Sequence, residues 1–400
     1  MILKKLNKKK LLIIFILLFI PCLTLAADFK IIKKKATVIN PKIVFPIQTS
    51  KGKCSEPAYH SFIPKIDPIE TLDAPKGYGL DDRFNIVRSN FEQLSIPCSG
   101  GNIQSCEIVK KIILKWAKAD APKRLKSGDL WNDTLTINLH INNPMMSAYS
   151  FARQVIEFTP KEEKLIEEWF TRTVERGEHL MYREKYGDGT GARGVPMSAH
   201  NHALSSAISH MQLGIILDDN KLFRKAFKNY EHAIRYQRKN GSLPIEVRRG
   251  GRAMFYQGRA MNALTVIAII AEHQGYNIWE YDHKGKGKNF HNLVKFFIDF
   301  TENNEIVFKY AKEMKAPGPA KDYKNQDLKI RRSSNWGWFY AYSTRFPDHE
   351  NIKRIEEWVK NPVGLNKYQL GFVRHYNNIG KSMFGDASWT VVEANCHFLK

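Results

Sequence analysis

Long segments with helical hydrophobic periodicity make up most of the chain, and this pattern limits the fold more than any other feature. In residues 106–121, for example, Ile112, Ile113 and Trp116 lie on one helix face, and Pro122 then stops the pattern. An alternating pattern typical of strands is almost absent, so we predict an all-α fold. The other predicted helices cover residues 147–158, 160–181, 200–217, 219–239, 251–274, 289–301 and 302–314.

Short turns join these segments, which favours antiparallel helix hairpins. Roughly 370 residues are too many for a simple bundle, and hairpins in a ring, an α/α toroid (incomplete α/α barrel) around a central cleft, would accommodate them. No strict short repeat is visible, so periodicity alone does not separate a toroid from a solenoid. Thr159-Pro160-Lys161-Glu162 predicts a capped helix start. We assign residues 27–75, rich in Pro and Lys, to an extended N-terminal arm and residues 76–400 to the toroid domain.

The first 26 residues have the parts of a secretory signal peptide. A lysine-rich start precedes the apolar run from Leu11 to Ile20, and small residues follow before Ala27. After Lys30 no apolar run reaches the length of about 18 residues that a transmembrane helix needs. We therefore expect an exported protein, periplasmic or secreted, with no integral membrane segment after signal cleavage.

Four of the five cysteines follow the predicted signal peptide, and an even number in an exported chain suggests two disulfides. Cys98 and Cys106 flank a short loop, so a local bridge between them is favoured. Cys54 with Cys396 would then join the two ends of the chain, although other connectivities stay open. No cysteine or histidine spacing resembles a zinc site, and we expect neither a metal nor another cofactor.

The formal net charge of +22 falls to +17 when the five lysines of residues 1–26 are removed. Such an excess attracts polyanions: nucleic acid, anionic lipid or acidic polysaccharide. Export and the lack of a recognition module argue against nucleic acid, so we expect a monomer whose partner is an anionic polysaccharide. The alternative is a solvated, lysine-rich surface with no particular ligand.

The side chains needed to remove a proton next to a carboxylate gather in the region from His200 to Tyr256. Asn240-Gly241 is suited to end one helix, and the arginine-rich run 245–252 leads into the next. Guanidinium groups in such a loop can converge on a carboxylate. Tyr256 follows Arg252 by four residues, so the two share one face if both are helical.

Two elements of this region resemble alginate lyases of the mannuronate-lyase type. Gly241-Ser242-Leu243-Pro244, Glu246, Arg249, Arg252-Ala253 and Tyr256 are similar to the family's G-x-L-P-x-E, basic residues and R-A-L-x-Y. His200-Asn201-His202-Ala203-Leu204-Ser205 resembles the family's N-N-H-[SY]-Y-W, and a weaker likeness extends over about residues 106–346. The resemblance implies an α/α-toroid polysaccharide lyase that cleaves a uronate polymer by β-elimination and leaves a 4,5-unsaturated sugar.

The resemblance also implies roles for four catalytic residues. The C5 proton of a uronate is removable only when the adjacent carboxylate is neutralised. Asn201 and Arg249 would hold that carboxylate, His202 would be the base or support it, and Tyr256 would protonate the departing O4 oxygen. For a mannuronate-like sugar Tyr256 could make both transfers, whereas for the C5 epimer His202 and Tyr256 would divide them. A free tyrosine has a pKa of about 10, so a tyrosine base needs nearby cations.

Further residues are assigned contacts with the substrate. The asparagines of this set precede a predicted helix and could equally cap it, and the tryptophans could equally pack between helices instead of stacking on sugar. Any one of these residue types alone is more often structural, and only their joint occurrence favours a site. The substrate-binding set comprises His200, Arg248, Arg252, Arg259, Asn142, Asn143, Trp336 and Trp338.

Departures from the family's pattern widen the expected substrate. Ala203 and Leu204 stand where aromatic residues are usual, and Arg259 stands where a tyrosine is usual. We therefore expect an acidic uronate polymer, either alginate or polymannuronate or a polyglucuronate-like chain. Lys65 and Arg88 are the candidates for the family's N-terminal substrate-binding lysine.

Two other function classes stay open. One is a non-catalytic binding protein for acidic polysaccharide on the same scaffold. The other, a glycosidase, needs a pair of carboxylic acids, and Glu246 is the only acidic residue within the motif.

Overall fold

The computed structural model describes residues 29–47, 66–74, 81–126, 130–178, 194–314, 322–328 and 336–377. Over these ranges the regular secondary structure is almost entirely helical, which confirms the all-α prediction. The strands found there, β1 (Thr71–Leu72) and β2 (Arg124–Leu125), form one short parallel pair. No described helix combines the length and apolar character that crossing a membrane requires.

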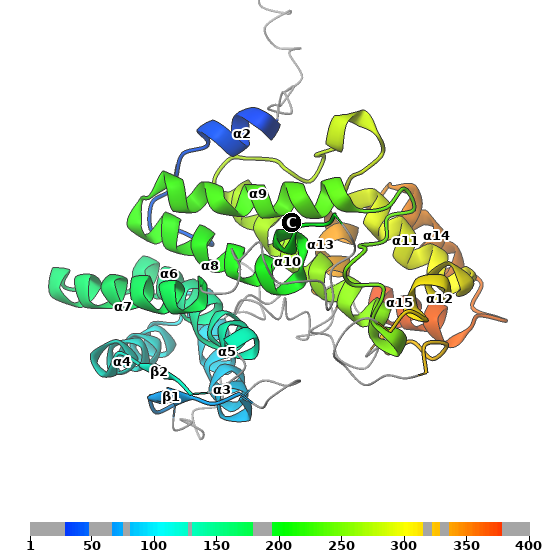
Figure 1. Ribbon diagram of the computed structural model, residues 1–400. Helices are drawn as coiled ribbons and strands as arrows, with labels where there is room; N and C mark the ends of the chain where they lie inside the picture. The colour runs from blue at the N-terminus through cyan, green and yellow to red at the C-terminus, as the bar shows by residue number, and fades with distance from the viewer. Residues whose placement is uncertain are drawn as a thin grey trace, which may run out of the picture.

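The longer helices follow one another along an arc, the incomplete α/α toroid that the sequence predicts (Figure 1). A first group of helices packs through α6 and α7 on α8, and the central group then packs through α10 on α13. The first group comprises α3 (Asp82–Ser99), α4 (Ile103–Ala119), α5 (Leu130–Ile137), the π-helical turn η1 (Asn138–Asn142), α6 (Asn143–Val155) and α7 (Pro160–Glu178). The central group comprises α8 (Asn201–Leu217), α9 (Asn220–Tyr236) and α10 (Ala253–His273). The last group comprises α11 (Phe290–Glu302), α12 (Glu305–Ala311), α13 (Gly337–Arg345), α14 (Glu350–Lys360) and α15 (Lys367–Asn377).

The predicted helices 200–217, 219–239 and 251–274 correspond to α8, α9 and α10 within three residues at each end. The prediction for 147–158 begins too late, because α6 starts at Asn143 and continues directly from α5 and η1. Of the asparagines expected before this helix, Asn142 ends η1 and Asn143 begins α6, so both lie in continuous helix. Their side-chain amides bond to neighbouring helices and therefore do not interrupt their own helix.

Inner and outer helices differ in what they bury. Nearly every residue of α8 and α10 is buried, whereas α9 and α14 bury one face and expose charges on the other. The turn between α8 and α9 folds closely over Gly214, where a Cβ atom would lie 2.3 Å from the backbone nitrogen of Phe223. Glycine is therefore required where the start of α9 packs on the end of α8.

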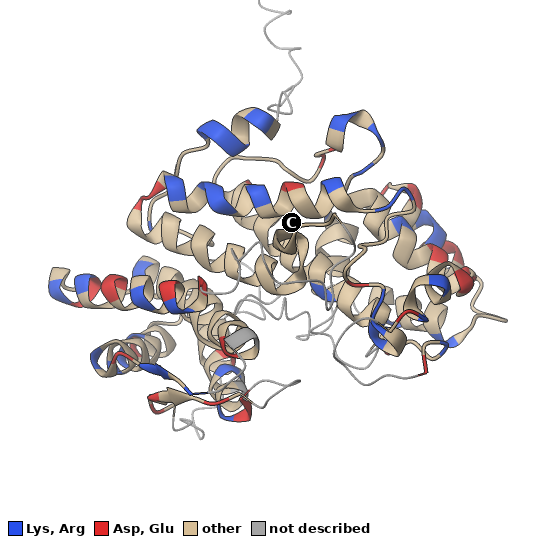
Figure 2. Cartoon of the chain, in the orientation of Figure 1, with Lys and Arg blue, Asp and Glu red and all other residues tan. Residues whose placement is uncertain are grey.

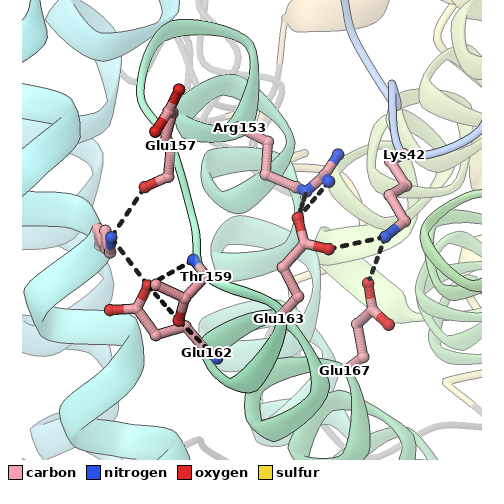
Figure 3. Close-up of polar contacts among 8 residues, drawn as sticks. Lys42, Arg153, Glu157, Thr159, Glu162, Glu163 and Glu167 are labelled. Carbon is pink, nitrogen blue, oxygen red and sulfur yellow. Dashed lines mark hydrogen bonds and ion pairs between the residues drawn. The ribbon is translucent and has the colours of Figure 1, made fainter.

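The start of α7 has the capping arrangement that the sequence predicts (Figure 3). The Thr159 backbone amide donates to Glu162 Oε2 (2.8 Å), the Glu162 amide donates to Thr159 Oγ1 (3.3 Å), and Pro160 is the first helical residue. Glu163 accepts hydrogen bonds from Arg153 and from Lys42 Nζ, the latter at 3.0 Å. The helix start thus also holds the N-terminal segment.

The N-terminal arm is more regular than expected, because Phe29–Lys35 forms the helix α2, which packs on α9. The following residues form bends and a turn, and side chains of the toroid bind them. Gln274 Oε1 accepts from the amides of Ile39 (2.9 Å) and Asn40 (2.8 Å), and Ser150 Oγ accepts from the Val44 amide (2.8 Å). The described part of the arm is therefore an integral layer of the fold.

In the structure the Sγ atoms of Cys98 and Cys106 are bonded to each other, across the turn between α3 and α4. The signal peptide of residues 1–26 and the second predicted pair, Cys54 and Cys396, lie outside the described residues.

Candidate active site

The start of α8 carries the first part of the site. His200 caps this helix, because its Nδ1 atom accepts a hydrogen bond from the His202 backbone amide (3.2 Å), and the short helix η2 (Met197–Ala199) precedes it. Asn201 and His202 are the first residues of α8, and both are buried. A buried polar helix start differs from the solvent-facing starts of outer helices and indicates a site.

The second part of the site is the loop between α9 and α10. Gly241 has a φ of 84°, and a Cβ atom there would lie 1.9 Å from the carbonyl oxygen of Asn292. Gln257 of α10 holds the loop on both sides: its Oε1 accepts from the Leu243 amide (2.9 Å), and its Nε2 donates to the Gly241 carbonyl (3.1 Å). The loop therefore has a fixed position relative to α10.

Glu246 connects the two parts. Its carboxylate is fully buried and accepts three hydrogen bonds from Asn201, one from the backbone amide (2.9 Å) and two from Nδ2 (3.1 and 2.9 Å). Arg249 Nε lies 3.4 Å from Glu246 Oε2. Glu246 is absent from the site residues predicted from the sequence. A lone acidic residue among arginines suggests an ion pair, but the contact with Asn201 exists only in the folded chain.

Arg249 brings the proposed catalytic residues together. Its guanidinium carbon lies 3.9 Å from the centroid of the Tyr256 ring, and its Nη2 atom contacts His200 Nε2. The rings of His200 and His202 are 4.7 Å apart. Arg249 and Tyr256 are only 5% and 6% exposed, so this cation–ring pair is largely shielded from water. The four predicted catalytic residues thus belong to one cluster around Glu246.

Electrostatics keep the imidazoles of the cluster neutral. Burial lowers the pKa of His202 well below its ordinary value, and the charges of Arg249 and Arg259 lower it further. Burial, His202 and Arg249 lower the pKa of His200 in the same way. A neutral imidazole can accept a proton, which a base requires. The pKa of Glu246 is raised because burial outweighs the opposing effects of Arg249 and Asn201.

Arg259 extends the cationic surroundings beyond Arg249. Its guanidinium carbon lies 5.5 Å from the ring centroid of Phe255, and its charge acts on both His202 and His140. His140, in η1, is 4% exposed, and burial, then Arg88, then Arg259 lower its pKa well below the ordinary value. Arg88 of α3 and Arg259 therefore both lie near His140. Lys65 lies outside the described residues.

The other predicted arginines point to different surroundings. Arg248 directs its Nε atom to Glu313 Oε2 (2.7 Å), away from Glu246. Arg252 ends the short helix η3 (Gly250–Arg252), one helical turn before Tyr256, and is partly exposed. Of the two, only Arg252 keeps the position that the sequence spacing predicts.

The structure does not bring the predicted asparagines and tryptophans to the cluster. Asn142 Nδ2 donates to Asn138 Oδ1 (3.1 Å) and to the Thr173 carbonyl (3.3 Å), and Asn143 Nδ2 donates to the Ser205 carbonyl (3.2 Å). Both amides are fully buried between helices and cap none of them.

Trp336 and Trp338 are 1% and 0% exposed. Their rings stack 6.1 Å apart, and Trp336 also stacks on His375 at 4.3 Å. Of the two roles left open for these tryptophans, the structure supports helix packing. Within the described part of the chain no set of three His, Cys, Asp or Glu residues is placed to hold a metal ion.

Comparison with known sequences gives one family. The family model described as "Alginate lyase" matches residues 107–308, half of the chain. The alginate lyase of Pseudomonas syringae pv. syringae (strain B728a) is 26% identical over 184 residues, which are 44% of this chain and 45% of that protein. The alginate lyase of Pseudomonas fluorescens (strain SBW25) is 26% identical over 252 residues, 62% and 60% of the two chains. The matches thus span about half of these relatives' length.

Two solved structures share the fold. One is a histidine-to-alanine variant of alginate lyase A1-III complexed with a tetrasaccharide, with a TM-score of 0.62, 18% identity and coverage of 80% of this chain and 92% of that one. The other is alginate lyase A1-III from Sphingomonas species A1, with a TM-score of 0.57, 19% identity and coverage of 81% and 87%.

Proposed function

Because this chain belongs to the alginate lyase family, we propose that it is an exported polysaccharide lyase that cleaves an acidic uronate polymer by β-elimination. The observation that carries the proposal is the buried contact between Arg249 and the Tyr256 ring, at 3.9 Å, beside Asn201 and His202. This contact places a guanidinium group that can bind the substrate carboxylate next to a phenol that can transfer a proton. The expected product is an oligosaccharide with a 4,5-unsaturated sugar at its new end.

Asn201 and Arg249 neutralise the carboxylate of the sugar whose C5 proton is removed. Both already contact Glu246, which fixes their positions before substrate binds. A buried carboxylate next to an anionic substrate would repel it. The charges of Arg249 and Arg259, which both act on Glu246, offset this repulsion.

The stereochemistry of the sugar decides which residue removes the proton. Where the C5 hydrogen and O4 lie on the same side, as in mannuronate, the Tyr256 phenolate takes the C5 proton. The C4–O4 bond then breaks as the C4–C5 double bond forms, and the phenol returns the proton to O4. In the C5 epimer the neutral imidazole of His202 takes the proton, and Tyr256 protonates O4.

The favoured polymer is alginate or polymannuronate, with a polyglucuronate-like chain as the alternative. Arg259 supports the wider range, because it adds a cation near His202 where the family usually has a tyrosine. Export to the periplasm, or secretion, follows from the signal peptide predicted over residues 1–26. The bonded pair Cys98–Cys106 supports this location, since disulfides persist in oxidising compartments.

The test offers polymannuronate, polyglucuronate and mixed alginate in turn to the folded, oxidised protein and follows the ultraviolet absorbance of unsaturated uronate. We expect signal on at least one polymer and its loss in Tyr256→Phe. Product mass separates elimination from hydrolysis, because a hydrolysed end is one water heavier. Absence of product on all three polymers, with salt-sensitive binding retained, would instead support the non-catalytic binding protein.

A further inference from the structure

A second group of cations lies outside the catalytic cluster, on α2, α9 and the loop that contains the short helix η4 (His283–Gly285). Both α2 and η4 pack on α9. Figure 2 shows Lys and Arg positions, in blue, along α2 and α9 and in the loop beside them. We use the term basic face for the exposed residues Lys30, Lys34, Lys35, Lys228, Arg235, Lys284 and Lys286.

The basic face contains a cavity of about 460 Å³, within the size range of small-molecule and sugar sites. Lys30, Arg235 and Lys284 line it together with the rings of Phe29 and Tyr281. These two rings stack with their centroids 3.9 Å apart, so the cavity combines an aromatic wall with cations at its edge. No residue of the catalytic cluster lines this cavity.

The acidic residues of the cavity are already engaged by the protein. Glu231 pairs with a lysine of α2, and Glu280 Oε2 lies 3.3 Å from His291 Nε2. Asp282 accepts hydrogen bonds from the backbone amides of residues 286–288, at 2.9–3.1 Å. These carboxylates therefore shape the loop and hold the helices. Lys30, Arg235 and Lys284 offset these three carboxylates inside the cavity, and the other lysines of the basic face give its surroundings a positive charge.

The cations of the basic face lie close enough to repel one another. The pKa of Lys288 is lowered by burial, then by Lys286 and Arg235. The pKa of His283 is lowered by burial, then by Arg235 and Lys284. A bound anion relieves such repulsion, so the same crowding that lowers these pKa values favours a negatively charged ligand.

We propose that the basic face and its cavity form a second binding site for an acidic polysaccharide, separate from the catalytic cluster. The ligand class rests on the proposed function, in which the same polymer is the substrate. The cavity favours a sugar chain over an anionic lipid surface, because a concave site with an aromatic wall and carboxylate acceptors fits hydroxyl-rich rings. Two sites on one long chain increase its affinity through effective concentration.

The arrangement of helices supports two separate sites. The catalytic residues belong to α8, α10 and the loop before α10, whereas the basic face belongs to the outer layer formed by α2 and α9 (Figure 1). Polymer length therefore decides whether one chain reaches both sites. A short oligosaccharide occupies the catalytic site alone.

The test compares the charge-reversed double variant Lys284→Glu/Lys286→Glu with Lys111→Glu/Lys118→Glu, a matched change of two exposed lysines on α4. Binding is measured with long polymannuronate and polyglucuronate in a Tyr256→Phe background, and turnover in the otherwise unchanged protein. We expect the first pair to weaken polymer binding by about tenfold and to raise KM for polymer. Turnover of a tetrasaccharide stays within about twofold of the parent, and the α4 pair changes polymer binding less than about twofold.

Equal weakening by both double variants would overturn the site, since net charge alone would then explain binding. Unchanged polymer binding in Lys284→Glu/Lys286→Glu would also overturn it. Binding to vesicles of anionic phosphatidylglycerol is measured in parallel, and a variant that loses vesicle binding but keeps polymer binding would overturn it too. Thermal unfolding shows whether each variant is folded, and Arg235→Gln supplies a milder second change in the cavity.

The two proposals fail in different ways. Polymer binding that depends on the basic face, without unsaturated product from any polymer, would refute the lyase and leave the second site standing. Unsaturated product together with binding that ignores the basic face would do the reverse.

Discussion

The catalytic cluster and the basic face both concentrate arginine or lysine, but they hold these cations in opposite ways. Arg249 is 5% exposed and lies between Glu246, His200 and the Tyr256 ring. The cations of the basic face are exposed on outer elements. Burial with partners fixes the geometry that catalysis needs, whereas exposed charges attract a polymer without fixing it.

Two adjacent arginines show the same contrast within one loop. Arg249 pairs with Glu246, whose side chain is fully buried, whereas Arg248 pairs with Glu313, whose side chain is 34% exposed. Breaking a buried pair costs about 3–5 kcal/mol, and an exposed pair contributes about 0–1 kcal/mol. Sequence neighbours can therefore differ greatly in importance.

The largest effect is expected for Arg249→Ala. In the proposed reaction it removes the cation that neutralises the substrate carboxylate, so kcat/KM should fall by about a thousandfold or more. Initial rates of unsaturated product measure the loss, with circular dichroism as the check on folding. Arg248→Ala is the matched control and should retain activity within about threefold. Similar losses from the two substitutions would contradict the contrast.

Glu246→Ala is expected to lower the free energy of unfolding by about 3–5 kcal/mol, because it leaves Arg249 buried without its carboxylate and Asn201 without its acceptor. Urea unfolding measures the change, and Glu313→Ala should cost less than about 1 kcal/mol. Glu246→Gln keeps the shape of the side chain and should lower kcat by about a hundredfold while the protein stays folded. Full activity in Glu246→Gln would show that the reaction does not require the Glu246 carboxylate to position Asn201.

Acid should destabilise the protein before its carboxylates titrate. The pKa values of His140, His200 and His202 are lowered in the fold, and that of His273 is lowered to about 4. Below pH 6.5 these histidines bind protons in the unfolded chain but not in the folded chain. The stability present at pH 7 is therefore lost as the pH falls. The His273 contribution alone amounts to about 2 kcal/mol at pH 5.

Urea unfolding at pH 7, 6 and 5 measures this loss, and a His273→Gln variant should show a shallower dependence. A free energy of unfolding that rises toward pH 5 would contradict the lowered pKa values of these buried histidines.

The smallest effect is expected for Arg259→Tyr, which restores the residue usual in the family. Arg259 acts on His202 and His140 from a partly exposed position, so KM for the preferred polymer should change by about three- to tenfold and kcat by less than about threefold. Relative rates on polymannuronate and polyglucuronate measure the shift in preference. A kcat loss as large as that of Arg249→Ala would make Arg259 part of the reaction itself.

The sequence predicts best what depends on neighbours along the chain. Helical periodicity placed α8, α9 and α10 within three residues, and the motif from Gly241 to Tyr256 predicted residues that do lie in one cluster. It gave Glu246 no role because the partner, Asn201, is 45 residues away and becomes visible only when α8 and α10 pack together.

Other predictions missed because residue type does not reveal the direction of a side chain. Asn142 and Asn143 are polar and precede a helical pattern, yet their amides fill the contacts between helices. Trp336 is as suitable for stacking on His375 as on a sugar, and the sequence cannot distinguish the two. The nearness of Arg88 to His140 requires the packing of α3 on η1.

Gln257 holds the loop of Arg249 to the helix of Tyr256, so the proposed carboxylate-binding group and the proposed proton donor move as one rigid unit. A substrate therefore meets these two groups at a spacing that does not depend on how tightly the polymer is gripped elsewhere. Under the proposed function, sugar preference can change at residues outside this unit without changing the geometry of proton transfer. This separation provides a physical route for one reaction to spread over many different polymers.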